Sequence, residues 1–278
     1  MSVINNDLTI VIPVLNEEKN LKACLEAIGH NFANKVIIID SGSTDQTQKI
    51  ALDSRAEIIQ FRWNGKFPKK RNWFLQQHPP KTQWVLFLDA DEYITDDFKN
   101  EVSKKLNTGN KVGYWLNYKI YFLGKPLRGG YPLRKLALFK VGAGEYERID
   151  EDQWSSLDME VHEHPVLHGS TGVIKSKIDH RDFKDIAHYV AKHNEYSDWE
   201  AKRYLKDIEA EKAKHSWTWK QKLKYRLIRS PLIGVVYFIG SYFFMGGFLD
   251  GSRGLTFAIL KMAYFTQVYG KIKEKTPE

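Results

Sequence analysis

Apolar runs of strand length alternate with helix-like segments along the first hundred residues. Four apolar-rich runs have the character of buried strands: Leu8–Val14, Lys35–Ile39, Ala56–Gln60 and Trp84–Leu88. Each is followed by a segment whose apolar residues recur at helical spacing, the last of them over Thr95–Leu106. This alternation predicts an α/β fold, in which a mostly parallel sheet is flanked by helices on both faces.

Residues with capping chemistry stand before the expected helices. We expect Asn16 to cap the first helix and Thr44 or Asp45 to cap the second, because their side chains can accept hydrogen bonds from free backbone N–H groups. Pro68 fits the first turn of a third helix over residues 69–77, where its missing N–H costs nothing.

The rest of the chain is less regular. Short strands between Gly-rich loops are expected from residue 112 to 180, followed by a charged helix over residues 184–214. We place a domain boundary near residue 215, which gives a catalytic domain over residues 1–215 and a basic, aromatic and then apolar helical segment over residues 216–278.

Composition narrows the class of protein. The chain has 278 residues with 42 Lys+Arg against 34 Asp+Glu, a net charge of +8. The single cysteine, Cys24, excludes a disulfide framework and a Cys-ligated zinc or iron–sulfur site. The polar start, Met1–Asp7, does not resemble a cleavable signal peptide, so we expect the catalytic part to face the cytoplasm.

Three polar clusters directly follow expected strands: Asn16–Glu17, Asp40–Asp45 and Asp89–Glu92. Ligands of such sheets bind at the carboxyl ends of the strands. We therefore expect these clusters to meet at one edge of the sheet.

The Asp89-Ala90-Asp91 segment suggests a divalent metal site. Residues i and i+2 of an extended segment point to the same side, so both carboxylates can reach one cation, and Mg²⁺ or Mn²⁺ suits oxygen ligands next to a diphosphate. The alternative is that Asp89 caps a turn and Asp91 is solvated.

The Asp40-Ser41-Gly42 turn can present a carboxylate to the donor edge of a nucleobase such as uracil. The loop after the first strand has no G-x-G-x-x-G and the chain has no G-x-x-x-x-G-K-[ST], which argues against a Rossmann dinucleotide site and a P-loop.

A basic cluster, Lys69-Lys70-Arg71-Asn72, stands at an expected helix start. It suits a bound anion or forms a solvated basic face.

Together these motifs resemble family 2 glycosyltransferases of GT-A fold, over about residues 8–180. The resemblance implies inverting sugar transfer from a nucleotide-sugar, most simply a UDP-hexose, with Asp89 and Asp91 at the metal and Asp40 at the nucleobase. The implied donor-binding set is Pro13, Asn16, Glu17, Asp40, Ser41, Gly42, Lys70, Arg71, Asn72, Asp89 and Ala90.

A later series, Glu160-Val161-His162-Glu163-His164 with Gly169 and His180, is similar to a subgroup that includes bacterial lipopolysaccharide-core β-glucosyltransferases. It implies Glu163 as the base that takes the acceptor proton, Glu160 as the second choice, and His180 as a third metal ligand beside Asp89 and Asp91. Many relatives have Arg-Leu-Phe where this chain has Ala-Leu-Phe at residues 137–139. Arg134 or Lys135 is expected to supply that charge.

The C-terminal segment has the composition of a membrane-associating element. Seven basic residues and no acidic one lie between Lys212 and Arg229, and Leu232–Leu249 is an uncharged run of 18 residues. An interfacial helix pair, a membrane span and a soluble helical cap are the three interpretations, and the first fits the glycines of the run best.

Membrane association would suit a lipid-linked acceptor and a peripheral place at the inner face of the cell membrane. Nucleic acid is a competing anion, disfavoured because the basic stretch leads into an apolar one. The alternative function is a non-catalytic membrane-surface or nucleic-acid-binding protein that keeps the fold.

Overall fold

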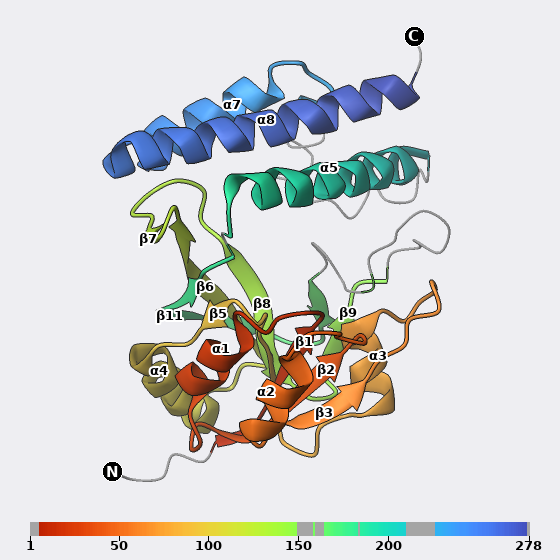
Figure 1. Ribbon diagram of the computed structural model, residues 1–278, viewed down its shortest axis with the longest axis vertical. Helices are drawn as coiled ribbons and strands as arrows, with labels where there is room; N and C mark the ends of the chain where they lie inside the picture. The colour runs from red at the N-terminus through yellow and green to blue at the C-terminus, as the bar shows by residue number, and fades with distance from the viewer. Residues whose placement is uncertain (1–5, 149–157, 159–163, 183, 210–225, 277–278) are drawn as a thin grey trace. The chain divides into compact units, whose positions relative to one another are not determined.

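The computed structural model describes residues 6–148, 158, 164–182, 184–209 and 226–276 (Figure 1). The chain divides into two compact units. The first consists of Met1–Ile120 and Leu133–Asp182, the second of Tyr121–Pro132 and Phe183–Glu278.

The strands and helices have the following bounds. The strands are β1 (Asn6–Val14), β2 (Ala33–Asp40), β3 (Glu57–Gln60), β4 (Trp84–Phe87), β5 (Glu92–Tyr93), β6 (Gly113–Phe122), β7 (Lys125–Pro126), β8 (Arg134–Lys140), β9 (Gly144–Tyr146), β10 (Pro165–Leu167) and β11 (Thr171–His180). The helices of the first unit are α1 (Leu21–Ile28), α2 (Thr47–Asp53), α3 (Lys70–Gln77) and α4 (Asp96–Thr108). Those of the second unit are α5 (Ile186–Glu209), α7 (Ile233–Ile239), the π-helical turn η2 (Gly240–Phe244), the 3₁₀ turn η3 (Gly247–Asp250) and α8 (Gly251–Lys275).

The main sheet is mixed, with the order β3-β2-β1-β4-β8-β6-β11-β5. Its first four strands are parallel neighbours, as the alternation of strands and helices predicted. β8 then runs antiparallel to both β4 and β6, and β11 runs parallel to β6. The predicted α/β fold with a mostly parallel, helix-flanked sheet is confirmed, and its core is formed by the apolar strands.

Two of the expected helix starts were wrong. α1 begins at Leu21 with Asn20 as its N-cap residue, because the Asn16 side chain is used elsewhere. The N-cap residue of α2 is Gln46, although Asp45 does accept the backbone N–H of Thr47 at 3.0 Å.

The other two expected helices lie close to their predicted ranges. Pro68 stands just before Lys69, the N-cap residue of α3, and therefore outside the first turn. Thr95 caps α4, and its hydroxyl accepts from Phe98 N at 3.2 Å.

The second unit contains α5, which packs against α8, and α7, which also packs against α8 (Figure 1). Its core residues are Ala201, Tyr204, Ile228, Ile233, Val268 and Ile272. The sequence placed α5 in the catalytic domain, but its contacts group it with the C-terminal helices. The expected boundary at residue 215 lies outside the described residues.

Among the described residues, no single helix is long and apolar enough to cross a bilayer. One pair of helical segments, Ile233–Phe244 and Gly247–Lys275, passes a length and hydropathy test together and is bent by 71°.

Candidate functional site

The loops after β1 and β2 meet at the carboxyl edge of the parallel strands and hold each other. Asn16, at φ 55°, donates its backbone N–H to the Ser43 hydroxyl at 2.9 Å and accepts the N–H of Thr44 at 2.8 Å. The backbone N–H of Glu17 donates to the Thr47 hydroxyl at 2.8 Å. Two of the three clusters that were expected to meet, Asn16–Glu17 and Asp40–Asp45, therefore lie together at this end of the strands.

Pro13 lies one residue before the end of β1, buried and paired with Ile39 of β2. It shapes the strand end, while Asn16 is exposed and Glu17 half-buried at the edge itself. Of these three residues, Asn16 and Glu17 are the ones that offer polar groups near solvent.

Asp40 ends β2 as a fully buried carboxylate. One oxygen accepts from Ser43 N at 3.0 Å and from the Ser43 hydroxyl at 2.6 Å, and the other accepts from Gln48 at 2.7 Å and Gln60 at 3.2 Å. Burial alone would raise the pKa of Asp40, but these hydrogen bonds outweigh it and lower the pKa. A nucleobase that contacts Asp40 has to displace one of the two glutamine amides.

Ser41 and Lys70 share a carboxylate that the sequence did not single out. The Ser41 hydroxyl donates to Asp158 at 2.5 Å, and Lys70 Nζ lies 3.1 Å from the same oxygen. Burial lowers the pKa of Lys70, and Asp158 opposes that shift. Gly42, exposed at φ +95°, supplies the left-handed turn between Ser41 and Ser43.

Asp89, at the end of β4, is held by two cations. One oxygen lies 2.8 Å from the Arg71 guanidinium and the other 2.6 Å from Lys135 Nζ. Lys135 also lies 2.5 Å from Glu92, whose side chain is 1% exposed. Of the two residues expected to supply the charge missing at residue 137, Lys135 pairs with Asp89 and Glu92, and Arg134 is exposed.

This network shifts the pKa values of its members in different directions. Partial burial would raise the pKa of Asp89, but Lys135 and Arg71 hold it well below its usual value. Burial would lower the pKa of Lys135, but Asp89 and Glu92 raise it well above its usual value. Burial, together with the Asp89 charge, raises the pKa of Glu92 to about 7 against the effect of Lys135.

Pairing of β5 with the end of β11 assembles a second group of acids. Glu92 lies opposite His180, and the backbone N–H of Arg181 donates to the carbonyl of Asp91 at 2.9 Å. Asp91, His180 and Asp182 consequently offer ligand atoms that all lie within 4.8 Å of one another, with His180 Nε2 3.8 Å from Asp91 Oδ1.

Two carboxylates and one imidazole suit Mn²⁺ or Mg²⁺, so these residues fit the expected metal. Asp91 and His180, two of the three residues expected at the metal, belong to this group, and Asp182 is its third member. The two oxygens of Asp89, the other expected ligand, lie against Arg71 and Lys135.

Asn72 and Ala90 are buried supports of the site. The Asn72 side chain donates to the Tyr146 carbonyl at 2.9 Å and accepts the Tyr146 N–H at 2.8 Å, which fastens β9 to α3. Arg71 lies over the Tyr146 ring at 5.4 Å. Asn72 has no exposed surface and Ala90 is 3% exposed, so their observed contacts are with the protein itself.

The predicted bases Glu163 and Glu160 lie outside the described residues. The sequence analysis gave no role to Asp182 or Asp158, and it named Glu92 only as the end of the Asp89–Glu92 cluster. The i, i+2 spacing of His180 and Asp182 was a usable signal for the first, whereas nothing in the sequence around Asp158 marks it.

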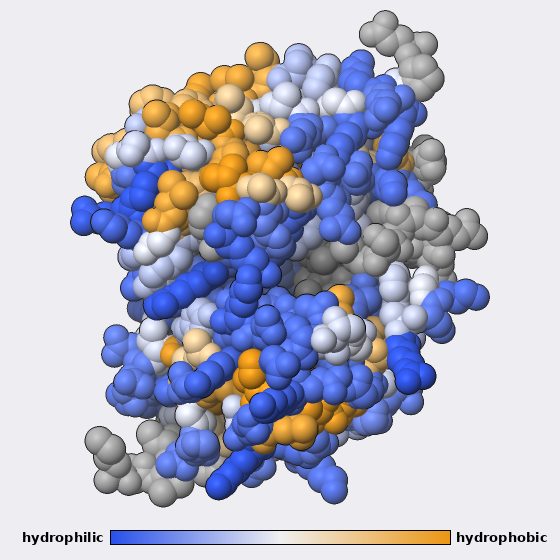
Figure 2. All heavy atoms as spheres, viewed as in Figure 1, coloured by the Kyte–Doolittle hydropathy of each residue, from blue (hydrophilic) through white to orange (hydrophobic). Residues whose placement is uncertain are grey.

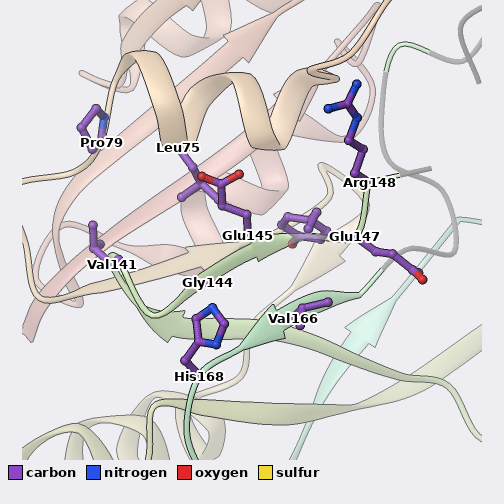
Figure 3. Close-up of a pocket in the computed structure, with 11 residues that line it drawn as sticks. Leu75, Pro79, Val141, Gly144, Glu145, Glu147, Arg148, Val166 and His168 are labelled. Atoms are coloured by element: carbon purple, nitrogen blue, oxygen red, sulfur yellow. The ribbon is translucent and has the colours of Figure 1, made fainter. Parts of the chain in front are cut away.

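An open pocket of about 610 Å³ lies between the end of α3 and β9–β10 (Figure 3). Glu145, Glu147, Arg148 and His168 are among its lining residues. Val141, another lining residue, donates its N–H to Gln83 at the amino end of β4. Because Asp89 follows the carboxyl end of β4, the pocket extends to the opposite edge of the sheet.

Comparisons with known proteins agree with this arrangement. The sequence model of glycosyl transferase family 2 matches residues 9–156. The chain is 32% identical over 99 residues to the SPbeta prophage-derived glycosyltransferase SunS of Bacillus subtilis, which covers 35% of this chain and 23% of that protein. It is 27% identical over 121 residues to an uncharacterized glycosyltransferase of Rickettsia bellii. This match covers 44% of this chain and 40% of that protein. The matches therefore span less than half the length of these relatives.

Among solved structures, the glucosyl-3-phosphoglycerate synthase of Mycobacterium tuberculosis, crystallised with Mn²⁺, UDP and glucosyl-3-phosphoglycerate, is similar at 24% identity. The match covers 42% of this chain and 44% of that one, with a TM-score of 0.32.

Proposed function

The chain belongs to glycosyl transferase family 2, and we propose that it moves a hexose from a UDP-sugar to a hydroxyl group of a glycan or lipid-linked acceptor, with inversion. The observation that carries this proposal is the group Asp91, His180 and Asp182, which stands beside the ion pairs of Asp89. We place the reaction in the synthesis of a cell-surface polysaccharide or lipopolysaccharide, at the cytoplasmic face of the cell membrane.

Asp91, His180 and Asp182 would hold Mg²⁺ or Mn²⁺. When bound, the ion would neutralise charge that develops on the diphosphate as the glycosidic bond breaks. Arg71 and Lys135 fix Asp89 beside this group, so that the loop carrying Asp91 stays in place without help from the donor.

The loops after β1 and β2 would receive the nucleoside. Asn16 and Glu17 offer polar groups at the edge, and Ser43 and Gln48 keep Asp40 ionised there. A carboxylate that is already ionised when the donor arrives can accept the N3–H of uracil without first losing a proton. One glutamine amide has to leave the carboxylate to make room for this hydrogen bond.

Inverting transfer needs a base for the acceptor proton as the acceptor oxygen attacks the anomeric carbon. Glu163 is the proposed base and Glu160 the alternative. Glu163→Gln should leave donor binding nearly unchanged and stop transfer. If Glu160→Gln does so instead, the assignment of the base moves to Glu160.

A donor panel tests the function directly. UDP-, GDP- and dTDP-sugars are each added with and without Mn²⁺, and the unfolding temperature and nucleotide release are measured. The expected result is a metal-dependent stabilisation by one UDP-sugar together with slow UDP release. Stabilisation without release would indicate a binding protein that keeps the fold, and no response to any donor would refute the proposal.

The ligand set has its own test, read without activity. Binding of Mn²⁺ in the presence of UDP is followed by electron paramagnetic resonance. Asp182→Asn should weaken binding at least tenfold, whereas Asp89→Asn should weaken it less. A stronger effect of Asp89→Asn would restore the ligand set expected from the sequence.

A further inference from the structure

The second unit exposes large apolar side chains around one bend. This bend segment, Ile239–Leu249, contains η2 and η3. Its exposed residues are Ile239, Phe243, Phe244, Met245, Phe248 and Leu249, from 42% exposed at Ile239 to 85% at Phe244. Figure 2 shows the apolar surface gathered over α7 and the neighbouring part of α8. Exposing side chains of this size to water costs free energy. A contiguous exposed apolar surface is therefore typical of a site that binds an apolar partner.

Hydrogen bonds to the loop between β7 and β8 hold the backbone of the bend segment in a defined conformation. Gly130 donates its N–H to the Met245 carbonyl at 2.8 Å, and the N–H groups of Arg128 and Gly129 donate to Asp250 at 2.8 and 3.1 Å. A Cβ atom on Gly129 would lie 2.1 Å from the Gly246 carbonyl oxygen. This close fit holds the bend segment while its apolar side chains remain exposed.

Charge distribution identifies the partner as an anionic bilayer. No charged residue occurs from Leu232 to Leu249, and the following Asp250 is 8% exposed and bound by two backbone N–H groups. The sequence just before the run, from Lys212 to Arg229, is basic without an acidic residue. An apolar segment that follows a basic stretch in the sequence matches the hydrocarbon and the anionic headgroups of such a bilayer.

The dimensions favour insertion without crossing. α7 and η2 together span Ile233–Phe244, 12 residues, or about 18 Å at 1.5 Å per residue. This is well short of a hydrocarbon core of about 30 Å. After a 71° bend the chain continues into α8, whose buried residues pack within the second unit.

We propose that the bend segment Ile239–Leu249 is an interfacial wedge that inserts Phe243, Phe244 and Phe248 into an anionic membrane surface. The inference deepens the proposed function, because it supplies the means of reaching a lipid-linked acceptor. Its failure is separable from that of the enzyme, since UDP release from a soluble donor needs no membrane.

The first experiment is co-sedimentation of the full chain with vesicles of phosphatidylcholine alone or mixed with phosphatidylglycerol. The wild type should bind the mixed vesicles more tightly. Phe243→Ser combined with Phe244→Ser should weaken binding by roughly 100-fold, about tenfold for each phenylalanine. Leu52→Ser is the matched control, because Leu52 of α2 is 64% exposed in the first unit. It should bind like the wild type, and all three proteins should release UDP equally.

A second measurement does not depend on the double variant folding. Cys24 is buried, so Phe244→Cys creates a single accessible thiol for an environment-sensitive dye. Its emission should shift to the blue on mixed vesicles, whereas the same dye on Leu52→Cys should not shift. Unchanged binding of the double variant, or no shift at position 244, would overturn the proposal. So would a wild-type dimer that the double variant dissociates while vesicle binding is unaffected, because the bend segment would then be a contact between two copies.

Discussion

Glu101 of α4 offers a test of how a single carboxylate holds the strand that leads to His180. β11 pairs with β6 in two stretches, with an irregularity between Val173 and Lys177. In this interval the N–H groups of Lys175 and Ser176 donate to Glu101 at 3.0 and 2.8 Å, and the Ser176 hydroxyl donates at 2.8 Å. Glu101 thus takes over hydrogen bonds that a regular ladder would make.

The magnitude follows from the pKa of Glu101. Partial burial would raise it, but the hydrogen bonds from Lys175 and Ser176 lower it from 4.5 to about 2. At about 1.4 kcal/mol for each pKa unit this difference corresponds to about 3.5 kcal/mol at neutral pH. The side chain is 20% exposed and glutamine keeps one acceptor oxygen, so Glu101→Gln should lower the free energy of unfolding by about 2 kcal/mol.

The sign of the pH dependence is fixed by the lowered pKa. The folded state binds this proton less readily than the unfolded state, so the stabilisation is present above pH 4.5 and is lost as the pH falls toward 2. The free energies of unfolding in urea of wild type and Glu101→Gln should differ by a constant amount near neutral pH, and this difference should shrink below pH 4.5. Glu26→Gln, on the exposed face of α1, should change stability by less than about 0.5 kcal/mol. A gap that does not depend on pH would refute the reasoning.

Three further substitutions test the candidate site. Lys135→Met removes the cation between Asp89 and the buried Glu92, and should lower the free energy of unfolding in urea by about 3 kcal/mol; unchanged stability would contradict the network. Asn72→Ala leaves the N–H and carbonyl of Tyr146 without their partner, and thermal unfolding should show a loss of about 2 kcal/mol. Asp91→Asn should abolish Mn²⁺-dependent UDP release with an unchanged circular dichroism spectrum, and retained release would remove Asp91 from the metal site.

The sequence predicted the parallel half of the sheet well because a strand buried on both faces has few polar residues. Helix starts were harder, because a polar residue at a strand end has two competing uses. Asn16 has the chemistry of a cap, but its amide oxygen instead accepts from Thr44 in the neighbouring loop. Whether Asn16 caps a helix or bonds to the neighbouring loop depends on how close the two loops lie in the fold. The local sequence carries no information on that distance.

The site shows the same limit. The spacing of Asp89 and Asp91 predicts a common role for the two carboxylates, but their contacts in the structure differ. Their separation came from elements far away in the chain: β8 brings Lys135 to Asp89, and β11 brings His180 and Asp182 to Asp91. β8 joins the sheet antiparallel to β4, and β11 joins it parallel to β6, both from far along the chain, so the partners were not predictable from the motif.

The charges of this edge suggest why two neighbouring aspartates differ. In the described contacts Lys70 pairs with Asp158, Arg71 pairs with Asp89, and Lys135 pairs with both Asp89 and Glu92. The carboxylates of Asp91 and Asp182, beside the imidazole of His180, then carry the formal charge that one divalent cation neutralises. If Asp89 were a ligand too, Arg71 and Lys135 would lose a partner and face the metal. Because Arg71 and Lys135 hold Asp89, Asp91 and Asp182 are the carboxylates that would balance the charge of the proposed ion.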